Sequence, residues 1–216
     1  KVLLISGSET HKDRVAQHKV VIDAARAAGA ALLAYTSAPG SLTAALADDH
    51  RGTEKVILES GLPYTLLRNS WYNENYTENL APVLEYNAVV QAAAEGKIAS
   101  ATRADYAAAA VAVLTGEGHE NTTYELSGDT AWSYAEYAAE VAKQAGKEIS
   151  FNAVSKEALA GILTGAGVPE PMAVILAGVD VSIEKGELAG TTGDLSRLIG
   201  RPTTPIADSI AAALKA

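Results

Sequence analysis

The stretch YTLLRNSWYNENY, residues 64–76, decides the fold expected for this chain. Its first six residues form an alternating apolar run of the length of a buried strand, and the rest gathers amides and aromatic rings. Polar and aromatic groups directly after a buried strand are typical of an open parallel sheet, because ligands bind there beyond the carboxyl ends of the strands. The neighbouring segments should then alternate between strands and helices.

Two more strands and two helices are expected before this stretch. KVLLIS (1–6) and ALLAYTS (31–37) are short apolar runs that end in polar residues, as buried parallel strands do. Helices are predicted over 14–28 and 48–61, and a glycine closes each of them. This β-α-β-α-β order predicts an α/β fold with a Rossmann-like parallel sheet, because parallel neighbours require crossover connections.

The rest of the chain first continues this pattern and then becomes mostly helical. GKIAS (96–100) and TYELSG (123–128) are predicted strands. Two Ser/Thr-x-x-acid patterns predict capping boxes, in which the first residue caps a helix and the acid reaches back. These boxes are Thr102 with Asp105, before a helix to about Thr115, and Ser133 with Glu136, before a helix that ends at Gly146. Short helices are expected over 155–163, 171–183 and 193–199, and a last helix is opened by Thr204 with Pro205 at its first position.

The composition disfavours several classes of function. The formal net charge of the 216 residues is −9 and the isoelectric point is near 4.9, so the average surface repels phosphate backbones and anionic lipids. The absence of cysteine excludes thiolate chemistry and fits a reducing cytoplasm. No apolar run approaches the roughly 20 residues of a membrane span. We expect a cytoplasmic protein with no nucleic-acid partner, no membrane partner and no metal site.

Three of the predicted strands end in polar residues that should meet at one edge of the sheet. These residues are Ser6, Gly7 and Ser8 after the first strand, Thr36 and Ser37 in the second, and Asn69, Ser70, Trp71 and Tyr72 in the third. The amide and the hydroxyls would hold a polar ring edge, while the aromatic rings would form flat apolar walls. The convergence predicts a slot for a planar heterocycle or a quinone. The alternative is that these are ordinary loop residues, because Ser, Asn and Gly favour turns wherever they occur.

Several segments resemble, in order and spacing, the NmrA-like branch of the atypical short-chain dehydrogenase/reductases. They are VLLISGSE (2–9), AYTS (34–37), DDHRGTEK (48–55), YTLLRNSWYNENY (64–76), GKIASATRADYAAAA (96–110) and LSRLIGRPTTPIADSI (195–210). Within this branch the chain looks most like the type 2 NAD(P)H:quinone oxidoreductases, with the triphenylmethane dye reductases next.

The resemblance implies a cofactor, NADPH or NADH, and a small-molecule quinone substrate. It implies that the turns Ser6–Ser8 and Asn69–Glu74 border the cofactor, which adds Asn73 and Glu74 to the candidate residues. A hydride would pass from the nicotinamide to a quinone that lies against the C-terminal helices. The implied organisation is a partial NAD(P)-binding Rossmann domain over 1–130 and a mostly helical substrate lobe over 131–216. A homodimer is the default expectation for such enzymes.

The chain departs from the larger dehydrogenase superfamily in its proton-transfer residues. That superfamily uses a Ser and then a Tyr-x-x-x-Lys pair to move a proton to or from a carbonyl. Ser37 stands at the expected strand end, but His50 takes the Tyr position and Glu54 the Lys position. An alcohol dehydrogenase mechanism is therefore disfavoured, whereas quinone reduction tolerates the loss because solvent can protonate the reduced oxygens. His50 is either a proton donor or a residue that merely lines its helix, and no acid–base catalyst is assigned.

The GATGxLG segment that opens this family does not occur in these 216 residues. Backbone amides at that turn bind the pyrophosphate, so the chain alone is expected to bind the cofactor weakly. KVLLIS is expected to pair only with ALLAYTS and to form an exposed apolar edge of the sheet. The expectation is that the sequence is a portion of a longer protein, or that another copy or chain covers this edge.

The leading hypothesis is NAD(P)H-dependent reduction of quinones or similar flat acceptors by direct hydride transfer. One rival is a non-catalytic NAD(P)-sensing regulator, which the NmrA-like branch also contains, and another is a structural or interaction module. Substitution of Tyr72 or Asn69 separates the first two, because it should lower an enzyme's turnover and leave a sensor's binding nearly unchanged.

Overall fold

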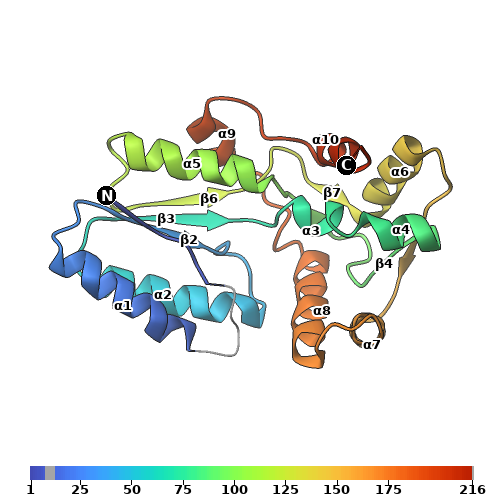
Figure 1. The fold of residues 1–216 in the computed structure, drawn as a ribbon, viewed down its shortest axis with the longest axis horizontal. Coiled ribbons are helices and arrows are strands. Elements are labelled where there is room, and N and C mark those ends of the chain that lie inside the picture. Colours follow the sequence, from blue (N-terminus) through green and yellow to red (C-terminus); the bar gives the residue numbers. More distant parts are fainter. Residues whose placement is uncertain (8–12, 216) are drawn as a thin grey trace.

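The main sheet has four parallel strands, in the order β1-β2-β3-β6. A computed structural model describes residues 1–7 and 13–215. The strands of the main sheet are β1 (Val2–Leu4), β2 (Leu33–Ser37), β3 (Tyr64–Asn69) and β6 (Thr122–Leu126). All four point the same way, so that their carboxyl ends face the helices at the other end of the molecule (Figure 1). The predicted parallel α/β fold is confirmed.

Helices cover both faces of this sheet (Figure 1). They are α1 (Arg14–Ala27) and α2 (Asp48–Glu59) on one face, and α5 (Arg103–Thr115) and α9 (Asp194–Ile199) on the other. Successive side chains of a strand point to opposite faces of the sheet, so neighbouring residues of β2 pack against different helices. Tyr35 of β2 packs with Ile22 of α1 and Ile57 of α2. Its neighbour Ala34 instead packs with Ala109 of α5. Each fully buried Ile contributes about 1.5 to 3 kcal/mol, so both faces hold the sheet firmly.

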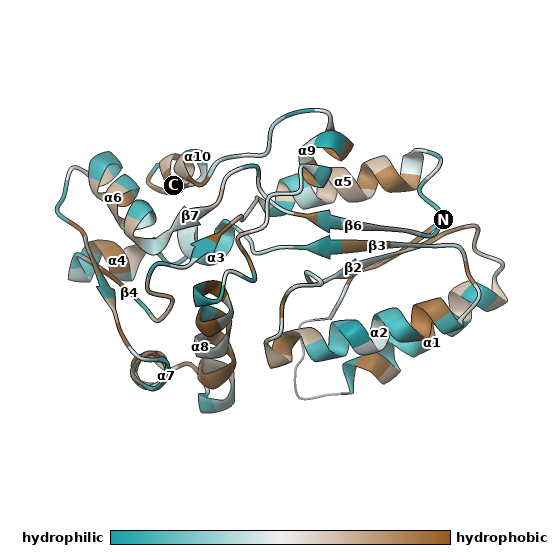
Figure 2. Ribbon diagram, turned by 180° about the vertical axis from the view of Figure 1, so that it is seen from behind, coloured by the Kyte–Doolittle hydropathy of each residue, from teal (hydrophilic) through white to brown (hydrophobic). Residues whose placement is uncertain are grey.

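A mostly helical lobe lies beyond the carboxyl ends of the strands (Figure 1). Its helices are α3 (Glu74–Thr77), α4 (Leu80–Tyr86), α6 (Tyr134–Ala145), α7 (Lys156–Gly165), α8 (Glu170–Glu184) and α10 (Ile206–Ala213). The short 3-10 helix η1 (Ala45–Ala47) follows β2. Figure 2 shows α8 as apolar along most of its length, yet no helix in the described part of the chain is long and apolar enough to cross a membrane.

Two small sheets complete the lobe. Strand β4 (Ala88–Gln91) pairs in parallel with β8 (Ser150–Ala153), and β5 (Lys97–Ile98) pairs antiparallel with β7 (Trp132–Ser133). The core beside them is aromatic: the Tyr76 and Trp132 rings lie edge to face with centroids 4.8 Å apart. The division at residue 130 stays a prediction. In the structure α4 and β4 pack with α6 and β8, while α9 lies on the main sheet.

The capping predictions had mixed outcomes. Ser133 and Glu136 form the expected capping box. Thr102 does cap α5 by accepting from the Asp105 N–H at 3.1 Å, but the prediction that the Asp105 carboxylate reaches back was wrong. That carboxylate accepts hydrogen bonds from the Thr204 N–H at 2.9 Å and from Arg201 at 2.6 Å, because the C-terminal segment crosses the start of α5.

Two predicted element bounds also required correction. The strand expected over 96–100 is only Lys97–Ile98, and it belongs to a small sheet instead of the main one. The last helix begins at Ile206, one residue later than predicted, with Pro205 in the capping position. The edge position of KVLLIS is confirmed, because among the described residues β1 pairs with β2 alone.

Candidate active site

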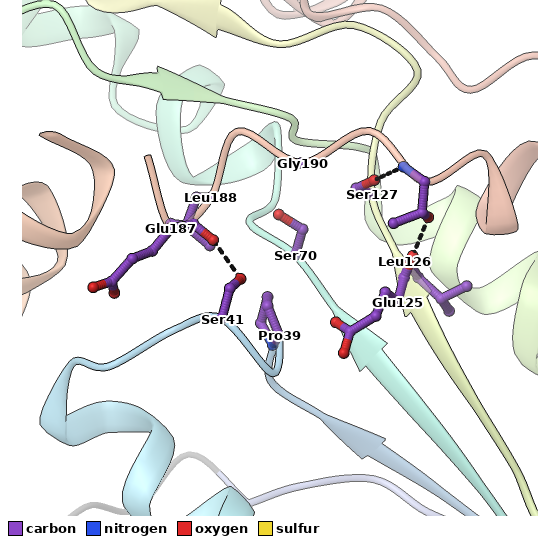
Figure 3. A pocket seen from close by; sticks show the side chains of 10 residues that line it. Pro39, Ser41, Ser70, Glu125, Leu126, Ser127, Glu187, Leu188 and Gly190 are labelled. Carbon is purple, nitrogen blue, oxygen red and sulfur yellow. Dashed lines mark hydrogen bonds between the residues drawn. The ribbon is translucent and has the colours of Figure 1, made fainter. Parts of the chain in front are cut away.

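A cavity of about 210 Å³ lies where the sheet meets the lobe (Figure 3). Its walls come from the ends of β3 and β6, the loop after β2 and the segment 187–192. The lining residues are Pro39, Ser41, Ser70, Glu125, Leu126, Ser127, Glu187, Leu188, Gly190 and Thr192. We call this space the lobe cavity. It is smaller than the roughly 300 to 1,000 Å³ of sites for drug-sized ligands, and it suits a single flat ring.

Hydrogen bonds from the loop after β2 hold the lobe cavity closed on one side. The Ser41 hydroxyl donates to the Glu187 carbonyl oxygen at 2.6 Å (Figure 3). The N–H and hydroxyl of Thr43 donate to the Glu187 carboxylate at 2.8 and 2.6 Å. On the sheet side, the Gly40 N–H donates to the Glu125 carboxylate at 3.2 Å. The loop therefore bridges the sheet and the lobe.

A second cavity, of about 90 Å³, is lined by the start of this loop and is called here the Ser37 cavity. Its lining residues are Ser37, Ala38, Pro39, Gly40, Ala47, His50, Arg51, Glu54 and Arg68. A ladder of polar side chains forms one wall. Ser37 Oγ donates to Glu54 Oε1 at 2.6 Å, and Arg68 donates to both Glu54 oxygens at 2.9 and 2.7 Å. Arg68 also donates to Glu125 at 2.8 Å, and its hydrogen bonds with Glu54 and Glu125 raise its pKa.

His50 lines the same cavity as a neutral imidazole. Its Nδ1 lies 3.0 Å from the Tyr35 hydroxyl. Burial, followed by the charge of Arg14, lowers the pKa of His50 to about 4. The ring is therefore uncharged at neutral pH and holds no readily released proton.

The comparisons with known proteins identify the family. No family model matches the chain. It is 48% identical to quinone oxidoreductase 2 of Escherichia coli (strain K12), over 97% of this chain and 74% of that protein. The chain belongs to the quinone oxidoreductase 2 family of NmrA-like short-chain dehydrogenase/reductases. The predicted family is thus confirmed.

Solved structures agree with this family. The crystal structure of the Escherichia coli NADPH-dependent quinone oxidoreductase with NADPH has a TM-score of 0.94 and 47% identity, over 98% of this chain and 75% of that one. The Citrobacter sp. triphenylmethane reductase with NADP(H) has a TM-score of 0.91 and 38% identity, over 98% of this chain and 75% of that one. The oxidoreductase family therefore shares the arrangement of sheet and lobe described above.

The turn after β1 lies at the carboxyl edge of the main sheet, as expected. The Ser6 N–H donates to the Thr36 hydroxyl at 2.9 Å, which joins two of the predicted site residues. The Gly7 N–H donates to His18 Nε2 at 3.2 Å, and its carbonyl oxygen accepts from Arg14 at 2.9 Å. Ser8 lies outside the described residues.

Of the predicted site residues at the strand ends, some line a cavity and others do not. Ser37 lines the Ser37 cavity and Ser70 lines the lobe cavity. The linings of these two cavities do not include Ser6, Thr36 or Asn69. Asn69 Oδ1 and Ser6 Oγ are buried polar atoms without a hydrogen-bond partner among the described residues.

The turn after β3 is tied to the rest of the chain. The Tyr72 ring packs against Tyr106, with centroids 5.3 Å apart, and the Arg103 guanidinium lies 5.7 Å from the Tyr72 centroid. Trp71 is half-buried against the aromatic core of the lobe. Both rings therefore pack against protein on at least one side, and their contact with a ligand stays a prediction.

Asn73 and Glu74 have evident structural partners. The Asn73 amide is fully buried, donates to Ser209 at 2.9 Å and accepts from the Ser100 hydroxyl at 2.6 Å. Glu74 accepts the Arg103 N–H at 2.9 Å and so caps α5. Their predicted place beside the cofactor stays a prediction.

Arg68 and Glu125 were not predicted from the sequence as candidate site residues. Each was taken as an ordinary member of an apolar strand, although a charged residue inside a buried strand is itself a signal, because such a residue requires a partner. The segment 187–192 carried no local pattern that could have placed it over the strand ends.

Proposed function

We propose that this chain carries out the NADPH-dependent reduction of quinones, or of similar flat conjugated acceptors, by direct hydride transfer. The observation that supports this most strongly is the 48% identity over 97% of the chain to quinone oxidoreductase 2 of Escherichia coli. The solved structure of that enzyme is described with NADPH, which favours NADPH over NADH as the cofactor.

The residues present fit the nicotinamide end of such a cofactor. Asn69 Oδ1 and Ser6 Oγ are buried and lack partners among the described residues, and both lie at strand ends on the carboxyl edge of the sheet. A buried acceptor without a donor is costly, by about 1 to 3 kcal/mol. The carboxamide and ribose hydroxyls of a nicotinamide nucleoside would supply the missing donors.

The bound nicotinamide would supply the hydride, and the chain's own residues would position the two rings. The loop after β2 would shield the reacting faces from water, since Glu187 and Glu125 hold it at both ends. No described residue of the Ser37 cavity is assigned as the proton donor. His50 is neutral, with its pKa lowered to about 4, and the Ser37 proton is already donated to Glu54. Solvent would protonate the reduced quinone oxygens.

The test is to mix the chain with menadione, a methyl-substituted naphthoquinone, and with NADPH at high concentration, because the chain alone is expected to bind the cofactor weakly, and to follow the loss of reduced nicotinamide. We expect oxidation that depends on both protein and quinone, and a lower kcat for Asn69→Ala than for the exposed control Asn152→Ala. NADPH binding without quinone-dependent oxidation would contradict the proposal and support the sensor. Homodimer formation stays part of the proposal, and light scattering would measure it.

A further inference from the structure

In the Ser37 cavity, the Ser37 hydroxyl can accept a hydrogen bond from a ligand but has no proton to donate to it. Arg68 donates to both oxygens of Glu54, so both oxygens act as acceptors. The Ser37 side chain is buried, and its single proton lies on the 2.6 Å hydrogen bond to Glu54. A charge-assisted bond of this length is strong, so the proton does not turn toward a ligand at small cost. The remaining lone pair of Ser37 Oγ is free to accept.

Arg68 places donors beside this acceptor. A guanidinium has five N–H groups, and among the described residues three of them are donated to Glu54 and Glu125. Ser37 and Arg68 are neighbours across β2 and β3 and line the same cavity. A ligand edge in this cavity therefore meets an acceptor and a donor side by side.

The charges of the cavity favour a neutral ligand edge. Two carboxylates, Glu54 and Glu125, flank the one guanidinium of Arg68. The other cation of the lining, Arg51, pairs with Asp48. An anionic group would meet the Glu54 carboxylate of the lining, and a cation would meet Arg68. At about 90 Å³, the space admits the edge of a ring and its substituents.

We propose that the Ser37 cavity selects, among flat acceptors, quinones that carry a neutral N–H or O–H donor next to a carbonyl oxygen. The donor binds Ser37 Oγ and the carbonyl oxygen accepts from Arg68, while Glu54 positions the Ser37 proton away from the ligand. This specificity rests on the proposed function, because it concerns the quinone of that reaction.

The test compares two ligands of nearly equal shape, menadione and its amino analogue, in which NH₂ replaces the methyl group. Binding to the full chain without NADPH is measured by quenching of tryptophan fluorescence. We expect the amino compound to bind about fivefold more tightly, the effect of one net hydrogen bond. Equal affinities, or tighter binding of menadione, would overturn the proposal while leaving quinone binding intact. If neither compound binds, the proposed function fails together with it.

One variant locates the preference. Ser37→Ala keeps both Glu54–Arg68 hydrogen bonds, so the fold should persist while the affinity ratio falls to about one. An unchanged ratio in Ser37→Ala would overturn the assignment.

Two controls complete the design. The exposed Ser150→Ala should keep the wild-type ratio. D-ribose carries adjacent hydroxyls without a conjugated ring, so it reports on recognition of a cofactor sugar. If D-ribose displaces the amino compound from the wild type but not from Ser37→Ala, the cavity binds sugar hydroxyls and the proposal is overturned.

Discussion

The carboxylate of Asp105, at the start of α5, accepts a hydrogen bond from the backbone N–H of Thr204 at 2.9 Å. The two residues lie 99 positions apart, and the contact holds the C-terminal segment against the turn that follows β3. Burial acts to raise the pKa of Asp105. Its hydrogen bonds from Thr204 and Arg201 outweigh burial and leave the pKa below its usual value. The ionised carboxylate is thus part of the folded structure.

Asp105→Asn should lower the free energy of unfolding by about 2 to 3 kcal/mol, because an amide NH₂ would face donors in a buried site. Urea denaturation at neutral pH measures the change. Because the folded-state pKa of Asp105 is lowered, its stabilisation is present above its unfolded pKa and is lost as the pH falls through the folded one. The exposed Asp208→Asn serves as the control and should change stability by less than about 0.5 kcal/mol. Equal effects of the two substitutions would contradict this role.

His50 should make the stability of the protein depend on pH in a defined window. Its folded-state pKa is about 4 and the ordinary pKa of a histidine is 6.5, so the unfolded chain binds the extra proton between these values. Stability should therefore fall as the pH drops from about 6.5 to about 4, by up to about 3 kcal/mol from this residue. His50→Gln should flatten that part of the profile, because Gln carries no titratable proton. Parallel profiles for the two proteins would show that His50 is not the cause.

Asp180 on α8 is a buried carboxylate that joins three parts of the lobe. It accepts from the Ala92 N–H at 2.6 Å and from the Tyr134 hydroxyl at 2.9 Å. Burial raises the pKa of Asp180, so the charged form is disfavoured in the folded state and the associated stability is lost as the pH rises through the folded pKa.

Asp180→Asn should consequently be as stable as the wild type at neutral pH, or more stable, because the amide keeps an acceptor for Ala92 and carries no charge. Asp180→Ala should lose about 2 to 3 kcal/mol, because it leaves the Ala92 N–H unpaired and opens a cavity. Thermal unfolding of the two variants side by side measures the difference. A loss in Asp180→Asn as large as in Asp180→Ala would mean that the charge itself stabilises the lobe.

Gly128, two residues after the end of β6, should not tolerate a side chain. A Cβ there would lie 2.0 Å from the Ser100 carbonyl oxygen, which is backbone and cannot turn aside. Gly128→Ala should therefore destabilise the fold by more than about 2 kcal/mol. Gly161, in the exposed part of α7, has nothing within 4 Å of its Cβ position, so Gly161→Ala should stabilise the protein by about 0.5 to 1 kcal/mol. Chemical denaturation decides the sign of each effect, and a stable Gly128→Ala would refute the close approach.

The main sheet was predictable because each strand is indicated by the pattern of its own short stretch of sequence. YTLLRN matches β3 residue for residue, and α6 ends at Gly146 as the sequence predicted, with this glycine in the left-handed conformation. The lobe was less predictable. Strands β4 and β8 pair across about sixty residues, and neither carries a strong alternating pattern, so their strand character depends on each other.

The candidate site could be found only in part. Parallel strand ends must share an edge, which is why Ser37 and Ser70 reach cavities there. The hydrogen-bond or ion-pair partner of each polar side chain could not be predicted, because it depends on tertiary packing. The Asp105 carboxylate accepts a hydrogen bond from Thr204 and not from its own helix start. Arg68 forms ion pairs with both Glu54 of α2 and Glu125 of β6.

The central claim is that a flat redox pair binds at the carboxyl edge of the main sheet, under the lobe. A crystal structure of the chain with NADPH and menadione tests this most directly. We expect the nicotinamide near Ser6 and Asn69, with the quinone beside the loop after β2 and one edge of its ring in the Ser37 cavity. Both ligands bound away from this edge, with the two cavities left without either ring, would contradict the account.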